Sequence, residues 1–555
     1  MSHLRRIIFA AVLVLAAYFG GKIIYRHLDP RTTICEEDIE NDHWIATSKY
    51  WLDRQVCSRL GLCGLAHWRP DPATIPWTRK FEVKNYWQKD GIEEASQNIL
   101  KEESQEGIPS LGSPIKSEDE DVDGDSSVLK DIPQYILDHA PLIHLYSGEN
   151  FWPSDIAEHL KFTTPYLNYT KVNISTHQHT PYNLHEVEKV YNSSYLFTQS
   201  TDDVEERPVW LGSAHNKPLP YDDEEGGDWE EEKERKSTNL ETATFSNGDG
   251  ETWYDVSRLD PALTEVAFVN DSHSPSPEKV EMRRSRTRKS QHAETCSSIT
   301  STAFKLGGYS SAPSILVVVD KGLGIVDAFW FYFYSYNFGT TVFNIRFGNH
   351  IGDWEHSLIR FQDGVPKAVF FSAHSGGLAY AWKAVEKAKG REKRPILYSA
   401  VGSHAMYPTA GRHPYILPFG LLADLTDRGP LWDPALNYMA YHYNTSITHN
   451  VDARSSRDST PTFNSTSLHP KLNASFQPAS CNPSAPLGWW WYSGRWGDKF
   501  YRLRDWRQWR FFGQYHYVNG PFGPRFKNLG RAKVCQSGHV CRIVEDLTDG
   551  RSWVG

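Results

Sequence analysis

The chain has 555 residues and a formal net charge of −9. This balance excludes a global basic field of the kind that recruits nucleic acid, so no nucleic-acid partner is expected. Hydrophobic residues make up 39% of the chain and aromatic residues 13%. We therefore expect an aromatic-rich folded core that is interrupted by polar insertions.

An apolar run at residues 7–25 follows Arg5 and Arg6. The run is long enough to span a bilayer once, and its basic flank predicts a cytosolic tail at residues 1–6. We therefore predict a signal-anchor helix over 7–25 that makes this a single-pass membrane protein with its bulk in the lumen. A cleaved signal peptide is the alternative.

The cysteines and sequons also favour the lumen. Cys57 and Cys63, like Cys535 and Cys541, are separated by five residues, a spacing that suits short-loop disulfides. Cys296 lies in a polar stretch and is predicted to be the unpaired thiol. Asn-X-Ser/Thr sequons predict a glycoprotein modified at Asn168, Asn173, Asn192, Asn270, Asn444, Asn464 and Asn473.

Changes in composition divide the rest of the chain. Residues 26–83 mix Cys, Trp and charge, and we predict a small luminal segment there. Residues 84–130 are acidic and rich in Ser and Gly, which predicts a disordered linker. Residues 131–555 are predicted to form a β domain with loop insertions at about 201–301 and 437–477.

The predicted β domain contains short β-prone runs separated by Gly and Pro, with few amphipathic helical stretches between them. The runs are Ser314–Asp320, Ile325–Asn337, Val342–Phe347, Ala368–Phe371 and Ile396–Tyr398. This pattern predicts a mainly β chain with a β-sandwich core, long disordered insertions and an N-terminal transmembrane helix.

Residues 349–361 read NHIGDWEHSLIRF. In a strand, the period of two places Asp353 and Glu355 on one face and His356 on the other. Carboxylate oxygens are the ligands that Ca²⁺ and Mg²⁺ take in proteins, and neighbouring His350 could hold a coordinated water. The motif therefore predicts a cation site at Asp353, Glu355 and His350.

Two further histidines, His374 and His404, each follow a β-prone run and are flanked by small residues. Adjacent strands of one sheet would bring both to the rim that carries the motif. His356, His374, Ser375 and His404 are therefore candidate ligand-binding residues. The alternative is a packed core edge, centred on Trp354, in which histidines and carboxylates pair with one another.

A different interpretation is a serine hydrolase of the secretory pathway. The sequence AHSGG, with Ser375 at its centre, follows a short strand and precedes a predicted helix at 378–389, as in a nucleophile elbow. Asp424 or Asp433 with His442 would complete the triad. No oxyanion segment precedes Ser375 and alternating β/α units are missing, so we expect a binding protein rather than an enzyme.

Trp and Arg residues are interleaved from Arg495 to Arg510. They could form an exposed platform for carbohydrate or lipid head groups through stacking and cation–π contacts. The alternative is a packed core from which the arginine heads reach solvent.

Several ordered strings resemble the fungal vacuolar protein sorting-associated protein 62 family: APLIHLYSGENFWPSD, VVVDKGLGIVDAFWFYFYSYN, GNHIGDWEH, SAHSGG, RPILYSAVGSHAMY and GRWGD. The resemblance covers about residue 133 to the C-terminal region, outside the predicted loops. It implies a membrane-anchored protein of the endomembrane system (vacuole, Golgi or ER) that is associated with delivery of proteins to the vacuole.

The string NHIGDWE is also similar to the GHRHDWE motif of the necrosis-inducing toxin family, with Gly352 in place of its second His. This second resemblance implies a β-sandwich that holds a divalent cation at Asp353 and Glu355. It also implies a glycolipid or glycan as the ligand.

Overall fold

The computed structural model describes residues 36–69, 129–172, 179–189, 195–218, 295–297, 308–342, 345–388, 391–414, 422–446, 474–536 and 541–547. The chain divides into two compact units. Unit 1 combines the N-terminal residues up to Thr74 with Phe500–Val518, and unit 2 contains Ile75–Lys499 and Asn519–Gly555.

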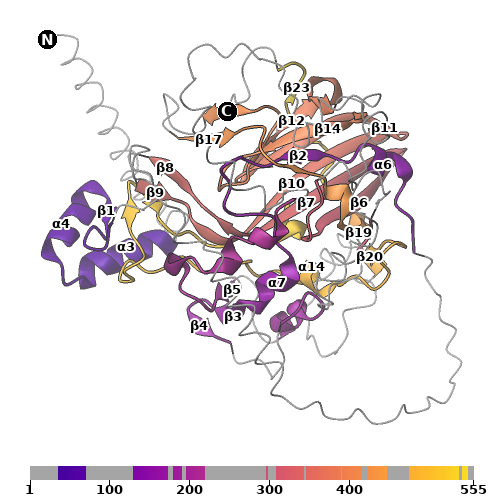
Figure 1. Cartoon of the computed structure of the whole chain (residues 1–555). Helices are drawn as coiled ribbons and strands as arrows, with labels where there is room; N and C mark the ends of the chain where they lie inside the picture. Colours follow the sequence, from indigo (N-terminus) through magenta and orange to yellow (C-terminus); the bar gives the residue numbers. More distant parts are fainter. Residues whose placement is uncertain are drawn as a thin grey trace, which may run out of the picture. The chain divides into compact units, whose positions relative to one another are not determined.

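Unit 1 joins two helices to a small antiparallel sheet whose strands come from both ends of the chain (Figure 1). Its elements are α3 (Glu36–Thr47), α4 (Trp51–Leu60), β1 (Leu62–Cys63), β21 (Arg510–Phe511) and β22 (Gln514–Tyr515). The predicted luminal segment 26–83 is therefore completed by residues 500–518, a pairing that composition could not indicate.

A buried carboxylate organises the inside of unit 1. Asp53 is only 3% exposed and accepts hydrogen bonds from the indole of Trp44 at 3.2 Å and from the amides of Gly64 and Ala66 at 3.1 Å each. Hydrogen bonds to a charged acceptor are stronger than neutral ones, so this cage fixes the loop after β1 against both helices.

Unit 2 is built on two sheets. The eight-stranded sheet has the order β20 (Phe476–Pro478), β19 (Tyr438–Tyr443), β6 (Ser314–Gly322), β7 (Ile325–Asn337), β10 (His350–Gln362), β11 (Val365–Ala373), β12 (Gly376–Ala381) and β23 (Ile543–Val544). The five-stranded sheet contains β13 (Lys387–Ala388), β14 (Arg391–Ser399), β2 (Leu142–His144), β18 (Leu431–Trp432) and β15 (Met406–Tyr407).

Both faces of the eight-stranded sheet are covered. Side chains of the two sheets share one apolar core, to which Trp330 and Tyr332 of β7, Leu397 of β14 and Trp432 of β18 contribute. Trp354 and Phe333 lie on the opposite face, where they pack with Trp489. The mainly β prediction is confirmed.

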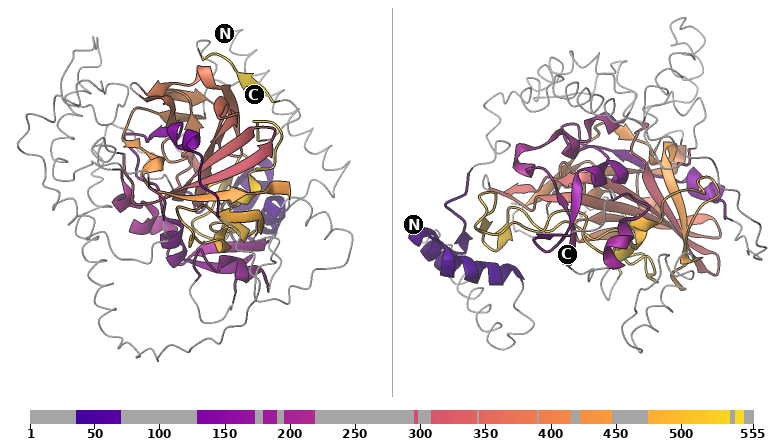
Figure 2. Two further views of the ribbon diagram at one scale, coloured as in Figure 1. Left: turned by 90° about the vertical axis from the view of Figure 1, so that its right-hand side faces the viewer. Right: turned by 90° about the horizontal axis from the view of Figure 1, so that it is seen from below.

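The second face of this sheet is covered by helices and a small three-stranded sheet (Figures 1 and 2). These elements are α7 (Ile156–Lys161), β3 (Thr163–Leu167), β4 (Thr170–Lys171), β5 (Leu196–Ser200) and α14 (Gly488–Trp491). The other short elements are α6 (Gln134–Asp138), β8 (Thr340–Val342), β9 (Ile345–Phe347), β16 (Gly411–Pro414) and β17 (Ala423–Thr426).

Strands β7 and β10 pair in the middle of the eight-stranded sheet, where both faces of each strand are buried. Their register places Asp353 opposite Tyr334 and Trp354 opposite Phe333. A strand buried on both faces cannot alternate between apolar and polar residues, because both sets of side chains enter a core. The few polar residues of β10 are therefore buried too, and each of them needs a hydrogen-bond partner.

Several sequence predictions concern segments outside the two main sheets. The predicted loop 437–477 begins and ends in strands, because β19 carries the buried aromatic sequence YMAYHY that polar neighbours obscured. Within the predicted insertion 201–301, residues 201–218 contain three short 3₁₀ helices. The linker 84–130 lies outside the described residues except for its last two positions.

The described residues contain three disulfides: Cys57–Cys63, Cys296–Cys481 and Cys535–Cys541. The two short-loop pairings agree with the spacings. The prediction of a free thiol at Cys296 is wrong, because Cys296 pairs with β19 next to the sheet core and lies beside Cys481. Cys35 lies outside the described residues.

The predicted signal-anchor at 7–25 also lies outside the described residues. In the part of the chain that the structure describes, no helix is both long and apolar enough to span a membrane. Of the predicted glycosylation sites, only Asn168 and Asn444 are described, and Asn444 is exposed.

Gly352 allows a close approach of two backbones beside the motif. Its φ is +67°, and a Cβ there would lie 1.8 Å from the carbonyl oxygen of Trp496. We expect Gly352→Ala to lower the free energy of unfolding by about 3 kcal/mol or more, because strain in φ and a backbone clash add together. Denaturant unfolding of the purified protein measures this loss.

Gly348→Ala is the matched control. Gly348 has a φ of +85°, but a Cβ there meets nothing within 4 Å. The substitution Gly348→Ala should lower the free energy of unfolding by only about 1 kcal/mol, from backbone strain alone. Equal losses in the two variants would show that the contact with Trp496 does not constrain the motif.

Candidate functional site

Strand β10 presents two carboxylates to the space between the two sheets of unit 2. Asp353 lies opposite Tyr334 and Glu355 lies opposite Tyr332, so both share the face that packs toward the five-stranded sheet. The two residues are only 5% and 2% exposed. Burying two like charges this close together is unfavourable unless protons or positive groups compensate for them.

His404 compensates for the charge of Asp353. Its Nε2 donates to the carbonyl of Phe151 at 3.1 Å, and its Nδ1 donates to Asp353 Oδ2 at 3.0 Å. A carbonyl and an ionised carboxylate can only accept, so both ring nitrogens carry protons and His404 is an imidazolium.

The pKa values agree with this ion pair. Burial alone would lower the pKa of His404, but the hydrogen bond to Asp353 and the negative charge of Glu149 raise it above its usual value. Burial alone would raise the pKa of Asp353, but the hydrogen bond from His404 and the charge of His350 lower it. The ring of Tyr334 stacks on His404 with centroids 3.7 Å apart.

Glu355 is in a different electrostatic state. Burial, and then the negative charge of Asp353, raise its pKa to about 7. The Ser372 hydroxyl and the His374 amide both donate to its carboxyl group, the amide at 3.2 Å. Glu355 therefore holds its proton to a higher pH than an ordinary glutamate does.

A third carboxylate, Asp424 of β17, holds His374. Its Oδ2 accepts from His374 Nε2 at 2.8 Å and from the Tyr407 hydroxyl at 2.7 Å, and its Oδ1 accepts from Ser403 at 3.0 Å. Burial alone would lower the pKa of His374, but the hydrogen bond and charge of Asp424 raise it. The His374 side chain is 31% exposed, so it connects the buried cluster to solvent.

Both histidines stand in the left-handed region, with φ of +56° at His374 and +54° at His404. This conformation is rare for a residue with a Cβ, and such residues concentrate at functional sites. His374 begins the two-residue turn from β11 to β12, and His404 follows β14. The strained turns point both imidazoles at carboxylates.

The structure therefore brings Asp353, Glu355, His374 and His404 into one hydrogen-bonded network, the carboxylate–histidine cluster. The route differs from the predicted one. The histidines come from two facing sheets, because β11 belongs to the eight-stranded sheet and β14 to the five-stranded sheet. The cluster also has the histidine–carboxylate pairing of the alternative packed-core interpretation.

The predicted site residues His350 and His356 are less suited to binding a ligand. His350 Nδ1 donates to the Gly352 carbonyl at 2.7 Å, and burial lowers its pKa. His356 is on the opposite face of β10, fully buried between Phe331 and Phe370, and burial keeps its pKa well below the usual value. The structure does not bring His356 to the cluster.

The fit of a divalent cation follows from these bonds. Within the described residues, no group of three or more His, Cys, Asp or Glu side chains is arranged to hold a metal ion. Asp353 already has His404 as its cation, and Glu355 accepts two protein hydrogen bonds. A Ca²⁺ or Mg²⁺ ion would have to replace the Glu355 proton and take water for its other ligands.

The nucleophile-elbow prediction is wrong. Ser375 lies in an exposed turn between two antiparallel strands, and the predicted helix at 378–389 is β12 followed by a short 3₁₀ turn. His442 is on β19, four strand positions from β11 in the same sheet, or about 19 Å at normal strand spacing. Asp433 is bound by Arg394 through both oxygens.

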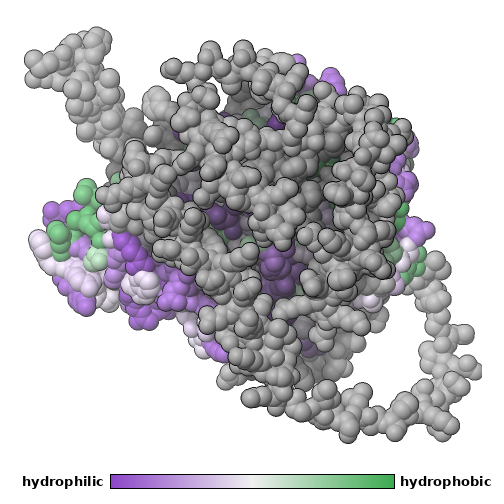
Figure 3. Space-filling model, viewed as in Figure 1, coloured by the Kyte–Doolittle hydropathy of each residue, from purple (hydrophilic) through white to green (hydrophobic). Residues whose placement is uncertain are grey.

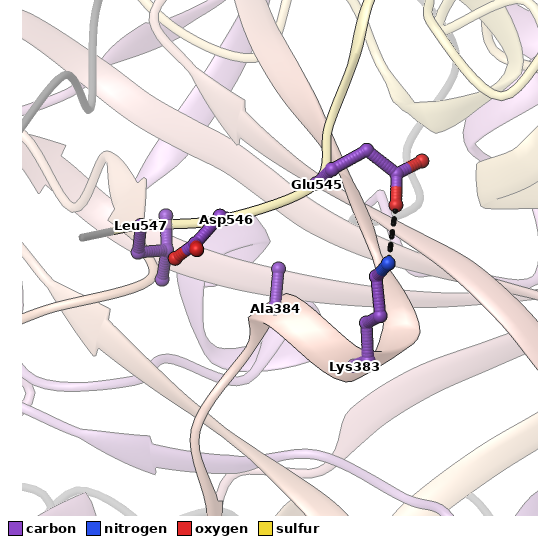
Figure 4. Close-up of a pocket in the computed structure, with 5 residues that line it drawn as sticks. All are labelled: Lys383, Ala384, Glu545, Asp546 and Leu547. Atoms are coloured by element: carbon purple, nitrogen blue, oxygen red, sulfur yellow. Dashed lines mark ion pairs between the residues drawn. The ribbon is translucent and has the colours of Figure 1, made fainter. Parts of the chain in front are cut away.

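A shallow hollow of about 660 Å³ lies elsewhere, where residues 545–547 pass Lys383 and Ala384 (Figure 4). Lys383 and Glu545 form a 3.0 Å ion pair across it, with side chains 74% and 65% exposed. Exposed pairs of this kind contribute little. The hollow is open to solvent and contains none of the predicted site residues.

Comparison with known proteins covers most of the chain. The chain is 32% identical over 437 residues to the putative vacuolar protein sorting-associated protein TDA6 of Saccharomyces cerevisiae. The aligned region covers 73% of this chain and 68% of that protein. The chain is also 32% identical over 421 residues to the vacuolar protein sorting-associated protein 62 of the same yeast, with the same two shares.

A family model described as vacuolar protein sorting-associated protein 62 matches residues 326–420. The chain belongs to the vacuolar protein sorting-associated protein 62 family. The matched region begins in β7 and includes β16, so it contains Asp353, Glu355, His374 and His404. No solved structure matches the chain.

Several residues that hydrogen-bond within the carboxylate–histidine cluster were not predicted from the sequence. Glu149 caps its own turn and accepts from the Gly402 amide at 2.9 Å, and Asn337 donates to Asp353 at 3.2 Å. Ser372, Ser403 and Tyr407 are common residue types, and no local sequence pattern marks them as site residues. Only Asp424 had been singled out, as part of a triad that the structure does not form.

Glu355 should make stability depend on pH. Because its pKa is about 7 in the folded protein and ordinarily 4.5, the unfolded chain loses this proton first, and stability falls as pH rises from 4.5 to 7. We expect Glu355→Gln to remove about 3 kcal/mol of that fall, at about 1.4 kcal/mol per pKa unit. Denaturant unfolding at pH 5 and pH 8 measures the difference.

The control for this prediction is Glu386→Gln. Glu386 is 30% exposed in its side chain and pairs with Arg428 at 2.6 Å on the five-stranded sheet side. The substitution Glu386→Gln should leave the pH dependence of the unfolding free energy close to that of the unchanged protein. If Glu355→Gln follows the same pH curve as the unchanged protein, Glu355 does not hold the proton.

Proposed function

We propose that this protein acts in protein sorting to the vacuole, and that its carboxylate–histidine cluster is the ligand-binding site used in that role. The observation that carries the sorting role is the membership of the vacuolar protein sorting-associated protein 62 family, with relatives that bear vacuolar-sorting names. The observation that favours this site is its set of buried ionisable groups, two of them on strained turns.

We place the protein in the endomembrane system, with a single-pass anchor at residues 7–25 and the two described units in the lumen. Disulfides form and persist in oxidising compartments, so the three disulfides support a luminal position. The apolar run after Arg5 and Arg6 supports the anchor.

The luminal position predicts N-glycosylation of the full chain. Peptide-N-glycosidase treatment of the expressed protein should increase its mobility, and Asn444→Gln should remove one step of the shift because Asn444 is exposed. Asn337→Gln cannot replace Asn444→Gln in this test, because Asn337 lies outside any sequon. The matched control is Thr445→Ser, which preserves the sequon at Asn444. An unchanged mobility after treatment would contradict the luminal assignment.

The ligand that suits the cluster has hydroxyl groups and accommodates a cation. His374 is the partly exposed end of the cluster, and its hydrogen bond to Asp424 fixes the orientation of its ring. Sugar hydroxyls both donate and accept hydrogen bonds, which fits a site of imidazole and carboxylate groups. A glycan, or the head group of a glycolipid, is therefore the class of ligand we propose.

Cation dependence would enter through Glu355. A pKa near 7 means that a proton and a divalent cation compete for the same carboxylate, so Ca²⁺ or Mg²⁺ would bind better at pH 8 than at pH 5.5. Asp353 and His350 would lie beside the ion, with water and ligand hydroxyls completing its coordination.

The cation proposal predicts a pH-dependent stabilisation. Millimolar Ca²⁺ or Mg²⁺ should raise the melting temperature at pH 8, have a smaller effect at pH 5.5, and have none on the double variant Asp353→Asn, Glu355→Gln. Asp363→Asn, in the exposed turn at the far end of β10, is the control that should respond like the unchanged protein. Equal responses of both variants would remove the cation from the proposal and leave the sorting role untouched.

A further inference from the structure

Exposed apolar residues are concentrated in unit 1. Nine of its described large hydrophobic side chains are exposed, Phe512 the most at 68%: Ile39, Tyr50, Trp51, Leu52, Leu60, Leu65, Trp68, Trp506 and Phe512. In Figure 3, hydrophobic side chains gather over this unit near α4. A surface of this kind on a small unit marks an interaction site.

The aromatic part of this surface is contiguous. His67 contacts the rings of Trp44 and Tyr50, with centroids 5.5 and 6.1 Å away, and Trp68 follows it in the loop after β1. The guanidinium of Arg69 lies 4.1 Å from the ring centroid of Trp506. The loop therefore contacts both the start of α4 and the C-terminal segment of unit 1, and we call the exposed side chains of these three segments the Trp surface: Tyr50, Trp51, Leu52, Trp68 and Trp506.

Cations accompany the aromatic rings on the Trp surface. Lys49 Nζ lies 5.1 Å from the ring centroid of Tyr50, and Arg69 stacks on Trp506. Trp51 and Leu52 are 65% and 62% exposed at the start of α4. Exposed Trp and Tyr with adjacent Lys and Arg are the composition found at the boundary between lipid head groups and acyl chains.

The surface is preformed rather than mobile. Asp53 ties the loop at Gly64 and Ala66 to α4, and the Cys57–Cys63 disulfide closes the same turn. Rings held in fixed positions lose little conformational freedom on binding. Burial of Trp489, Trp490, Trp491, Trp496 and Trp509 also shows that the Trp- and Arg-rich stretch is mostly core, and that Trp506 is its exposed exception.

We propose that the Trp surface of unit 1 lies in the head-group region of the membrane that carries the protein. The position of the unit in the chain selects a bilayer over other occupants. The described part of unit 1 begins at Glu36, and the inference rests on the proposed anchor at 7–25, because residues 26–35 can reach at most about 35 Å even when extended. This tether would keep the surface close to the luminal face of its membrane, where Lys49 and Arg69 could reach the head groups beside the aromatic rings.

Photocrosslinking of the full chain in its own membranes tests this inference. The photoreactive residue p-benzoylphenylalanine would be placed at Trp51, at Trp68 or at Trp506, each in a separate variant with an otherwise unchanged sequence. Tyr182 of unit 2, 51% exposed, is the matched aromatic control, and Leu323, 94% exposed, is the control for simple exposure. Membranes labelled with radioactive phospholipid report the adducts after illumination.

Phospholipid adducts should form at Trp51, Trp68 and Trp506 several-fold more often than at Tyr182 and Leu323. The photoreactive residue is itself aromatic, and agreement between two positions far apart in sequence excludes misfolding of one variant as the cause. A protein adduct in place of a lipid adduct would overturn the inference and identify the Trp surface as a protein-docking site. Adducts at the control level would overturn it as well.

Discussion

The pair formed by Asp353 and His404 is the interaction on which the candidate site depends. It connects β10 of the eight-stranded sheet to the turn after β14 of the five-stranded sheet, inside a core that is otherwise aromatic. Removing one member of a buried ion pair leaves an uncompensated charge and costs about 3–5 kcal/mol. The left-handed turn at His404 is tolerated because this bond and the Tyr334 stack hold it there.

The same pair sets the state of Glu355. Asp353 stays ionised because His404 is protonated, and its charge then helps to keep the proton on Glu355. Two carboxylates two residues apart on one strand thus have different protonation states at one pH, as in many sites where acid and base functions must be separated. Acidification along the endomembrane system would alter Glu355 and His374 before it altered the ion pair.

Sequence patterns predicted the strands well and the pairing of chain segments poorly. Ile325–Asn337 coincides with β7, and the period of two correctly separated Asp353 and Glu355 from His356. The meeting of His374 and His404 was expected, but from neighbouring strands. Which sheet a strand joins depends on contacts between residues hundreds of positions apart, and no local pattern records them. For the same reason, Glu149 was not predicted, and Asp424 was predicted only in a triad that does not form.

The composition of unit 1 has a consequence for the order in which the protein is completed. Strand β1 pairs with β21, and the core around Trp44 and Cys57 includes Phe500 and Tyr515. At synthesis rates of about 5–20 residues per second, the helices α3 and α4 wait on the order of tens of seconds for those partners. The helices that are synthesised first therefore belong to the unit that finishes folding last. Until then, its aromatic residues stay uncovered, which makes the early steps of biogenesis the period when this protein most needs assistance.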